Sequence, residues 1–79
     1  MKTEYIKIID HDPEKKARIL TKKINENNYE IIEMDIPVEY RFKGIENELL
    51  EEVTDDADRE NVTLHVDINN INNIYNRLI

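Results

Sequence analysis

The sequence predicts a small α+β domain, a two-layer sandwich in which a sheet of three or four strands carries helices on one face. Apolar and polar residues alternate in segments 3–9, 29–42 and 62–68, the period of strands with one solvated face. Other segments place apolar residues three or four positions apart, the period of an amphipathic helix. The expected order is β-α-β(β)-α-β-α within a single domain, residues 1–79.

A first helix is expected from about residue 13 to residue 26. Asp12 can cap it, and Pro13 suits the first helical position because its missing N–H would lack a partner there anyway. Asn27-Asn28 is a plausible stop, since Asn tolerates positive φ. The buried stripe of this helix would consist of Ala17, Leu20 and Ile24.

The strand before it, residues 3–9, puts Ile6 and Ile8 on one side and Tyr5, Lys7 and Ile9 on the other. The run IKIIDHDPEKKARIL resembles the first strand and helix of response-regulator receiver domains, and that resemblance implies a divalent-metal site in the acidic turn between them. Two features depart from the receiver pattern: the chain is much shorter, and the acidic run of the turn is interrupted, reading Asp10, His11, Asp12.

The middle segment alternates from Ile32 to Phe42, with Met34, Ile36, Val38 and Tyr40 expected on the same side. A straight strand over residues 29–42 would span roughly 46 Å, whereas a domain of this size has a radius of gyration near ~12 Å. We therefore expect a bend or a split at Pro37, on a sheet edge. A split would produce βαββαβ, a ferredoxin-like arrangement, and the sequence leaves both possibilities open.

A second helix is predicted after Gly44, because apolar residues recur every four positions from Ile45 to Ala57. A last strand over residues 62–68 would point Val62, Leu64, Val66 and Ile68 inward. The tail NNINNIYNRLI suggests a final helix that buries Ile71, Ile74, Tyr75 and Leu78.

Negative charge is concentrated in residues 46–60, which hold eight carboxylates and one cation, Arg59. Their net charge of −7 equals that of the whole chain, because residues 1–43 balance nine cations against nine acids. Such asymmetry favours an oriented interaction with a basic partner and disfavours direct nucleic-acid binding, which needs a positive face.

Absent residue types argue against most enzyme classes. The chain has no serine and no cysteine, so the common nucleophiles are missing. Its single glycine, Gly44, excludes a phosphate-cradling glycine loop and a dinucleotide fingerprint. We expect a cytoplasmic protein that is not an enzyme, with no cofactor and no contact with membranes.

Metal binding remains an alternative, although no ligand is assigned. Residues 56–67 repeat acids as a calcium loop does, but Asn61 replaces the turn glycine and Asp67 replaces the bidentate glutamate. His65 and Asp67 share a strand face that Glu33 and Asp35 could join. A divalent-metal-responsive domain using these groups, or the turn at residues 10–12, is one competing hypothesis.

The leading hypothesis is a small acidic inhibitor or regulator of the antitoxin, immunity or phage-inhibitor type. It would present its acidic helix, as a nucleic-acid mimic, to a basic surface of a partner protein, which could itself be a nucleic-acid-binding surface. The second hypothesis is a homo-oligomer such as a homodimer, in which the basic first helix meets the acidic helix of another copy. The cations of that first helix are Lys15, Lys16, Lys22 and Lys23. The leading hypothesis requires acids unmatched by Lys or Arg, and its partner-binding residues are Glu48, Glu51, Glu52, Asp55, Asp56 and Asp58.

Overall fold

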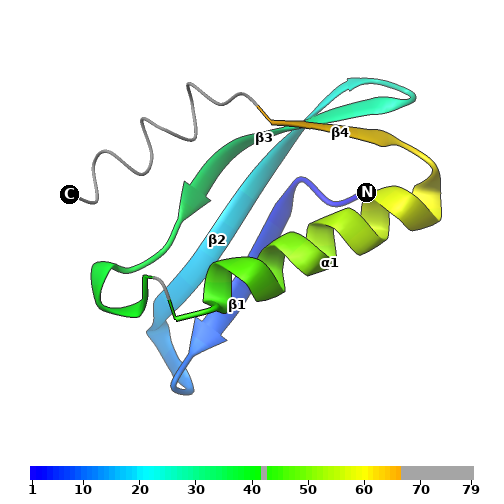
Figure 1. Ribbon diagram of the computed structural model, residues 1–79. Helices are drawn as coiled ribbons and strands as arrows, with labels where there is room; N and C mark the ends of the chain where they lie inside the picture. The colour runs from blue at the N-terminus through cyan, green and yellow to red at the C-terminus, as the bar shows by residue number, and fades with distance from the viewer. Residues whose placement is uncertain (42, 67–79) are drawn as a thin grey trace.

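A computed structural model describes residues 1–41 and 43–66, which form a four-stranded mixed sheet with one helix on one face (Figure 1). The sheet order is β1-β2-β3-β4; the first three strands pair antiparallel, and β4 runs parallel to β3. The predicted α+β sandwich is confirmed. The elements are β1 (Glu4–Ile9), β2 (Asp12–Asn25), β3 (Asn28–Asp35), a 3₁₀ turn (Val38–Tyr40), α1 (Ile45–Glu60) and β4 (Thr63–Val66).

The predicted first helix is wrong, because residues 12–25 form β2, the central strand between β1 and β3. Burial along β2 has period two, with Ala17, Ile19 and Thr21 all buried on the side of α1. Ile24, expected in the buried stripe of a helix, is exposed. The resemblance to a receiver domain fails with that helix.

The residues interpreted as helix signals instead build turns. Asp10 and His11 have φ of 53° and 57°, and two successive positive values are what a two-residue type I′ hairpin turn requires. The Asp12 side chain accepts the Glu14 N–H at 3.0 Å, as a helix cap would, but it does so at the start of a strand. The β2–β3 hairpin likewise uses an Asn side chain, since Asn25 Oδ1 accepts the Asn27 N–H at 2.9 Å.

A bulge in β3 breaks the predicted alternation. The register between β2 and β3 shifts so that Leu20 pairs with Glu33 while Thr21 pairs with Ile31. Ile32 is therefore the extra residue, and it is exposed although it was expected to share a side with the buried Met34. The strand ends at Asp35, two residues before Pro37, where the chain turns away from the sheet.

The ferredoxin-like alternative is wrong for the described residues, because β1 and β2 are joined by a hairpin and not by a helix. The second predicted helix is confirmed as α1, which connects the parallel strands β3 and β4. Gly44 precedes it with φ of 88°. Asn61 ends it with φ of 59°, and Val62 N–H donates to Ala57 O at 3.0 Å, as in a Schellman motif.

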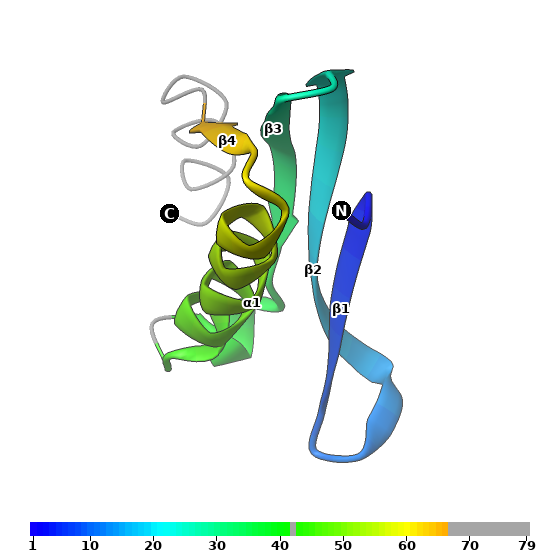
Figure 2. The same ribbon diagram turned by 90° about the vertical axis from the view of Figure 1, so that its right-hand side faces the viewer.

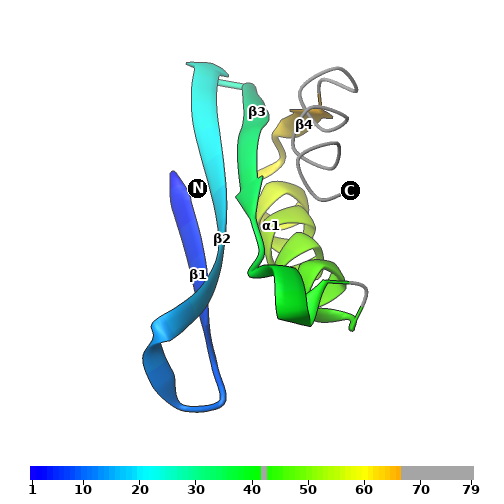
Figure 3. The same cartoon turned by 90° about the vertical axis from the view of Figure 1, so that its left-hand side faces the viewer.

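One core lies between α1 and the covered face of the sheet. Leu49 and Val53 from α1 pack with Tyr5, Ile19 and Ile31 from the first three strands, and all five are almost fully buried. Figures 2 and 3 show that α1 lies on one side of the sheet, while no described element covers the other side. Leu64 of β4 packs at the edge of this core, whereas Val66, expected inward, is exposed. The predicted final helix, with Ile71, Ile74, Tyr75 and Leu78, and the inward Ile68 lie outside the described residues, as does Phe42.

Candidate functional site

Seven of the eight acids of α1 divide between two sides of the helix, and the eighth, Glu46, is half-buried. Because α1 turns once every 3.6 residues, side chains four positions apart lie along the same side. The buried Leu49, Val53 and Ala57 define the side against the sheet. Two acidic rows flank it: one, toward β1, contains Glu48, Glu52, Asp56 and Glu60, and the other, facing away from the sheet, contains Glu51, Asp55 and Asp58.

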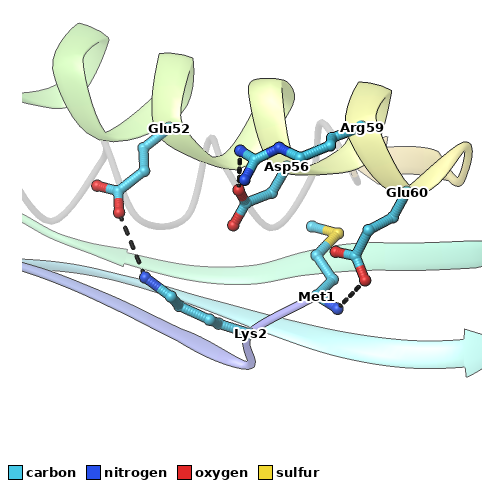
Figure 4. A pocket seen from close by; sticks show the side chains of 6 residues that line it. All are labelled: Met1, Lys2, Glu52, Asp56, Arg59 and Glu60. Carbon is cyan, nitrogen blue, oxygen red and sulfur yellow. Dashed lines mark hydrogen bonds and ion pairs between the residues drawn. The ribbon is translucent and has the colours of Figure 1, made fainter.

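Groups from β1 and from the residues before it pair with the row toward β1. Glu48 forms an ion pair with Lys7, and Glu52 lies 3.6 Å from Lys2 Nζ. Glu60 Oε1 lies 2.6 Å from the amino group of Met1 (Figure 4). The carboxylates of Glu48 and Glu52 are about half exposed, so their pairs contribute little to stability but cancel local charge.

Asp56 is held more firmly than its neighbours. Its Oδ2 accepts the hydroxyl of Tyr5 at 2.7 Å, and its Oδ1 accepts a guanidinium N–H of Arg59 at 2.6 Å. The Tyr5 hydrogen bond, followed by the Arg59 charge, lowers the pKa of the Asp56 carboxyl below its ordinary value. Burial, followed by the bond to Asp56, raises the pKa of the Tyr5 hydroxyl above its usual value. The pair is thus a structural tie between β1 and α1.

A hollow of about 520 Å³ opens beside this tie, between the start of the chain and the second half of α1 (Figure 4). Its lining alternates in sign, with Lys2 and Arg59 set among carboxylates that already form ion pairs with them. A ligand of either charge would have to displace an existing pair there. The residues lining the hollow are Met1, Lys2, Glu52, Asp56, Arg59 and Glu60.

The row facing away from the sheet is different. Glu51, Asp55 and Asp58 are all exposed, and within residues 1–41 and 43–66 none of them forms an ion pair with Lys or Arg. From Glu51 to Asp58 there are seven residue steps, or about 10 Å of helix axis. We call these three residues the outward acidic row.

The predicted acidic patch is therefore smaller than the sequence suggested. The expectation that no Lys or Arg matches the acids of the helix does not hold for Glu48, Glu52 and Asp56. Their role in binding a partner stays a prediction, as does that of the outward acidic row. One signal in the sequence points to the neutralisation: alternation in residues 3–9 already puts Lys7 on the same side as the buried Tyr5 and Ile9.

The basic residues assigned to a first helix do not form one surface. They lie on β2, where Lys16 and Lys22 alternate with Lys15 and Lys23 and so point to opposite faces of the sheet. Lys15 lies over the ring of Tyr40, and Lys23 pairs with Glu26 at 3.1 Å. The predicted association of a basic helix with the acidic helix of a second copy is wrong in that form.

The positions considered for metal binding are spread over separate elements. Asp56, Asp58 and Glu60 belong to α1 and not to a loop. Asp10 accepts the Tyr40 hydroxyl at 2.6 Å, and His65 pairs across the ladder with Glu30, away from Glu33 and Asp35. In the described part of the chain no three His, Asp or Glu side chains come together as a metal site.

Fold and surface together define a small α+β sandwich whose one described helix carries an outward acidic row. The sequence matches no protein-family model and no curated protein. Among the residues that the structure describes, no helix has both the length and the apolar character needed to cross a bilayer.

Proposed function

We propose that this protein binds another protein, and that the outward acidic row of α1 meets a basic surface on that partner. The observation that supports this proposal is the contrast between the two acidic rows. The row toward β1 is matched by Lys2, Lys7, Arg59 and the N-terminal amino group. The outward acidic row has no such match in the described residues, and it is presented on a helix fixed to the core by Leu49 and Val53.

A rigid acidic row suits recognition more than it suits chemistry. The backbone of a packed helix loses little conformational freedom when a partner binds, so more of the interaction energy remains for association. Long-range attraction would speed the encounter with a basic surface. The proposed role is that of a non-enzymatic inhibitor or regulator.

The density of unpaired charge bears on mimicry of nucleic acid. Three carboxylates over about 10 Å correspond to roughly one charge per 3–5 Å, below the one charge per ~1.7 Å of duplex DNA. The charge density of the outward acidic row is therefore comparable to that of one DNA strand and lower than that of the duplex. A partner that normally binds nucleic acid is included in the proposal, and competition by duplex DNA identifies that case.

The test is a capture experiment with matched charge reversals. The wild-type chain is immobilised at low salt, and bound proteins from a candidate host are eluted with increasing salt. The triple variant Glu51→Lys, Asp55→Lys, Asp58→Lys should lose the salt-sensitive partner. The control Glu14→Lys, Glu26→Lys, Glu39→Lys makes the same change in net charge at exposed positions outside α1 and should retain it. Equal loss in both variants, or binding indifferent to salt, would contradict the proposal.

A further inference from the structure

The face of the sheet opposite α1 carries large apolar side chains that nothing in the described structure covers. Ile6 and Ile8 on β1 are 45% and 55% exposed, and Ile32 at the β3 bulge is 40% exposed. Leu20 lies between them on β2 and is half-buried. A solvated sheet face normally carries polar residues at alternate positions. We call this surface the open face.

Charges on the open face are sorted by strand. Burial of Ala17 and Ile19 against α1 places Lys16, Arg18 and Lys22 of β2 on the opposite side. The same alternation, with the bulge, places Glu30, Glu33 and Asp35 of β3 on the open face. The ion pair between Arg18 and Glu33, at 3.8 Å, confirms that the two strands present these side chains together. A cationic column thus lies beside an anionic column.

We propose that the open face binds a second copy of this chain, so that the protein forms a face-to-face dimer. Charge complementarity identifies the occupant. A copy rotated by half a turn about an axis along the strands, between β2 and β3, lays the cationic column of each copy over the anionic column of the other. Aligned sheets pack about 10 Å apart in this way, and a two-fold arrangement uses the same patch twice.

The cross-strand register sets the pairs. Arg18 is opposite Asp35 and Lys22 is opposite Glu30 within one sheet, so the half-turn brings each cation over its counterpart in the other copy. Leu20 and Ile32 lie between these charged positions and would form the apolar centre of the interface. An axis perpendicular to the strands would instead oppose like charges along β2, which charge repulsion disfavours.

The size of the patch predicts a weak dimer. The two overlapping strands, β2 and β3, at ~4.8 Å spacing and with about six residues each at ~3.3 Å, cover a small footprint, below the lower limit of specific interfaces. We therefore expect a reversible dimer whose dissociation constant is micromolar or higher. Such a dimer would leave both outward acidic rows on its two outer surfaces and would present them as a bivalent unit.

Sedimentation from about 10 µM to 1 mM tests the dimer. The wild-type chain should shift from monomer to dimer with concentration, and Ile32→Lys, at the apolar centre of the interface, should raise the dissociation constant at least about tenfold. Val38→Lys, at an exposed apolar position outside the strands, is the matched control and should leave it unchanged. A wild-type chain that stays monomeric, or a dimer insensitive to the open-face variant, overturns the proposal.

A charge exchange tests the arrangement itself. Lys22→Glu and Glu30→Lys should each weaken self-association, because like charges then meet at both symmetric contacts. An equimolar mixture of the two variants should associate again, since each copy supplies what the other lacks. Circular dichroism of each variant checks that it is folded, and a mixture of two folded monomers would refute this arrangement. The triple variant of the outward acidic row should dimerise normally, so failure of the partner proposal and failure of the dimer remain distinguishable.

Discussion

The two faces of the sheet differ in what their side chains contribute. On the covered face, Tyr5, Ile19 and Ile31 are excluded from water by α1, and a buried hydroxyl bonds a carboxylate. On the open face, Ile6 and Ile8 remain about half exposed, and Arg18 forms ion pairs as long as 3.8 and 3.9 Å. Similar residue types are thus buried in the core on one face and stay partly exposed to solvent on the other.

The largest difference in stability should appear when one apolar side chain is truncated in the core and one on the open face. Leu49 is 1% exposed, so Leu49→Ala should lower the free energy of unfolding by about 2–5 kcal/mol through lost burial and a cavity. For a domain with about 5–15 kcal/mol in total, that is a large fraction. Ile8→Ala should cost less than about 1 kcal/mol, because its side chain is 55% exposed. Urea unfolding monitored by circular dichroism, at a concentration where the chain is monomeric, compares them; similar losses would contradict the assigned faces.

Removing a polar contact should also cost more stability on the covered face than on the open face, but the difference should be smaller than for the apolar side chains. Tyr5→Phe removes the hydroxyl that Asp56 accepts at 2.7 Å and should cost about 1–3 kcal/mol, typical of a hydrogen bond to a charged group. Glu4→Gln weakens the exposed pair with Arg18 at 3.9 Å and should change stability by at most a few tenths of a kcal/mol. Thermal melting of the two variants measures the difference, and a larger effect of Glu4→Gln would reverse the comparison.

The smallest effect should be a pH dependence confined to the covered face. The pKa of Asp56 is lowered in the folded protein, so its contribution to stability is present above its ordinary value of 3.8 and is lost as the pH falls through the folded value. The pKa of Tyr5 is raised, so its contribution is complete below 10.0 and is lost as the pH rises above it. Melting temperatures between pH 2 and pH 11 should show both losses, and Tyr5→Phe should reduce both. Unchanged profiles in that variant would exclude the tie.

Residues 12–25 and 45–60 show how far local pattern can predict this fold. Both runs are rich in charge and contain apolar residues spaced by three or four, and both were predicted as helices. In residues 45–60 the helical spacing does match the buried positions, because Leu49, Val53 and Ala57 repeat every four residues and all three are buried. In the first run, a helical stripe leaves out Ile19, which the structure buries completely at spacing two.

For the candidate site, too, local features were predictable from the sequence and long-range contacts were not. The sequence located the acidic helix and its excess of carboxylates, because both are local properties of residues 45–60. It did not separate the two acidic rows, since that depends on Lys2 and Lys7, which are more than forty residues away along the chain. The bulge at Ile32 was equally hidden, because a bulge is defined by pairing with β2 and not by the strand's own residues.

The sequence by itself determined the α+β class, the helix after Gly44 and the net charge of −7, because periodicity, capping and composition are carried by neighbouring residues. Tertiary structure alone decided that residues 12–25 become the central strand, that Met1, Lys2 and Lys7 neutralise three of the helix acids and that no described element covers one face of the sheet. A helix of that length is marginal in water, whereas pairing on both sides and burial against α1 stabilise the strand. Those contacts join residues far apart in the chain, where local propensity has no influence.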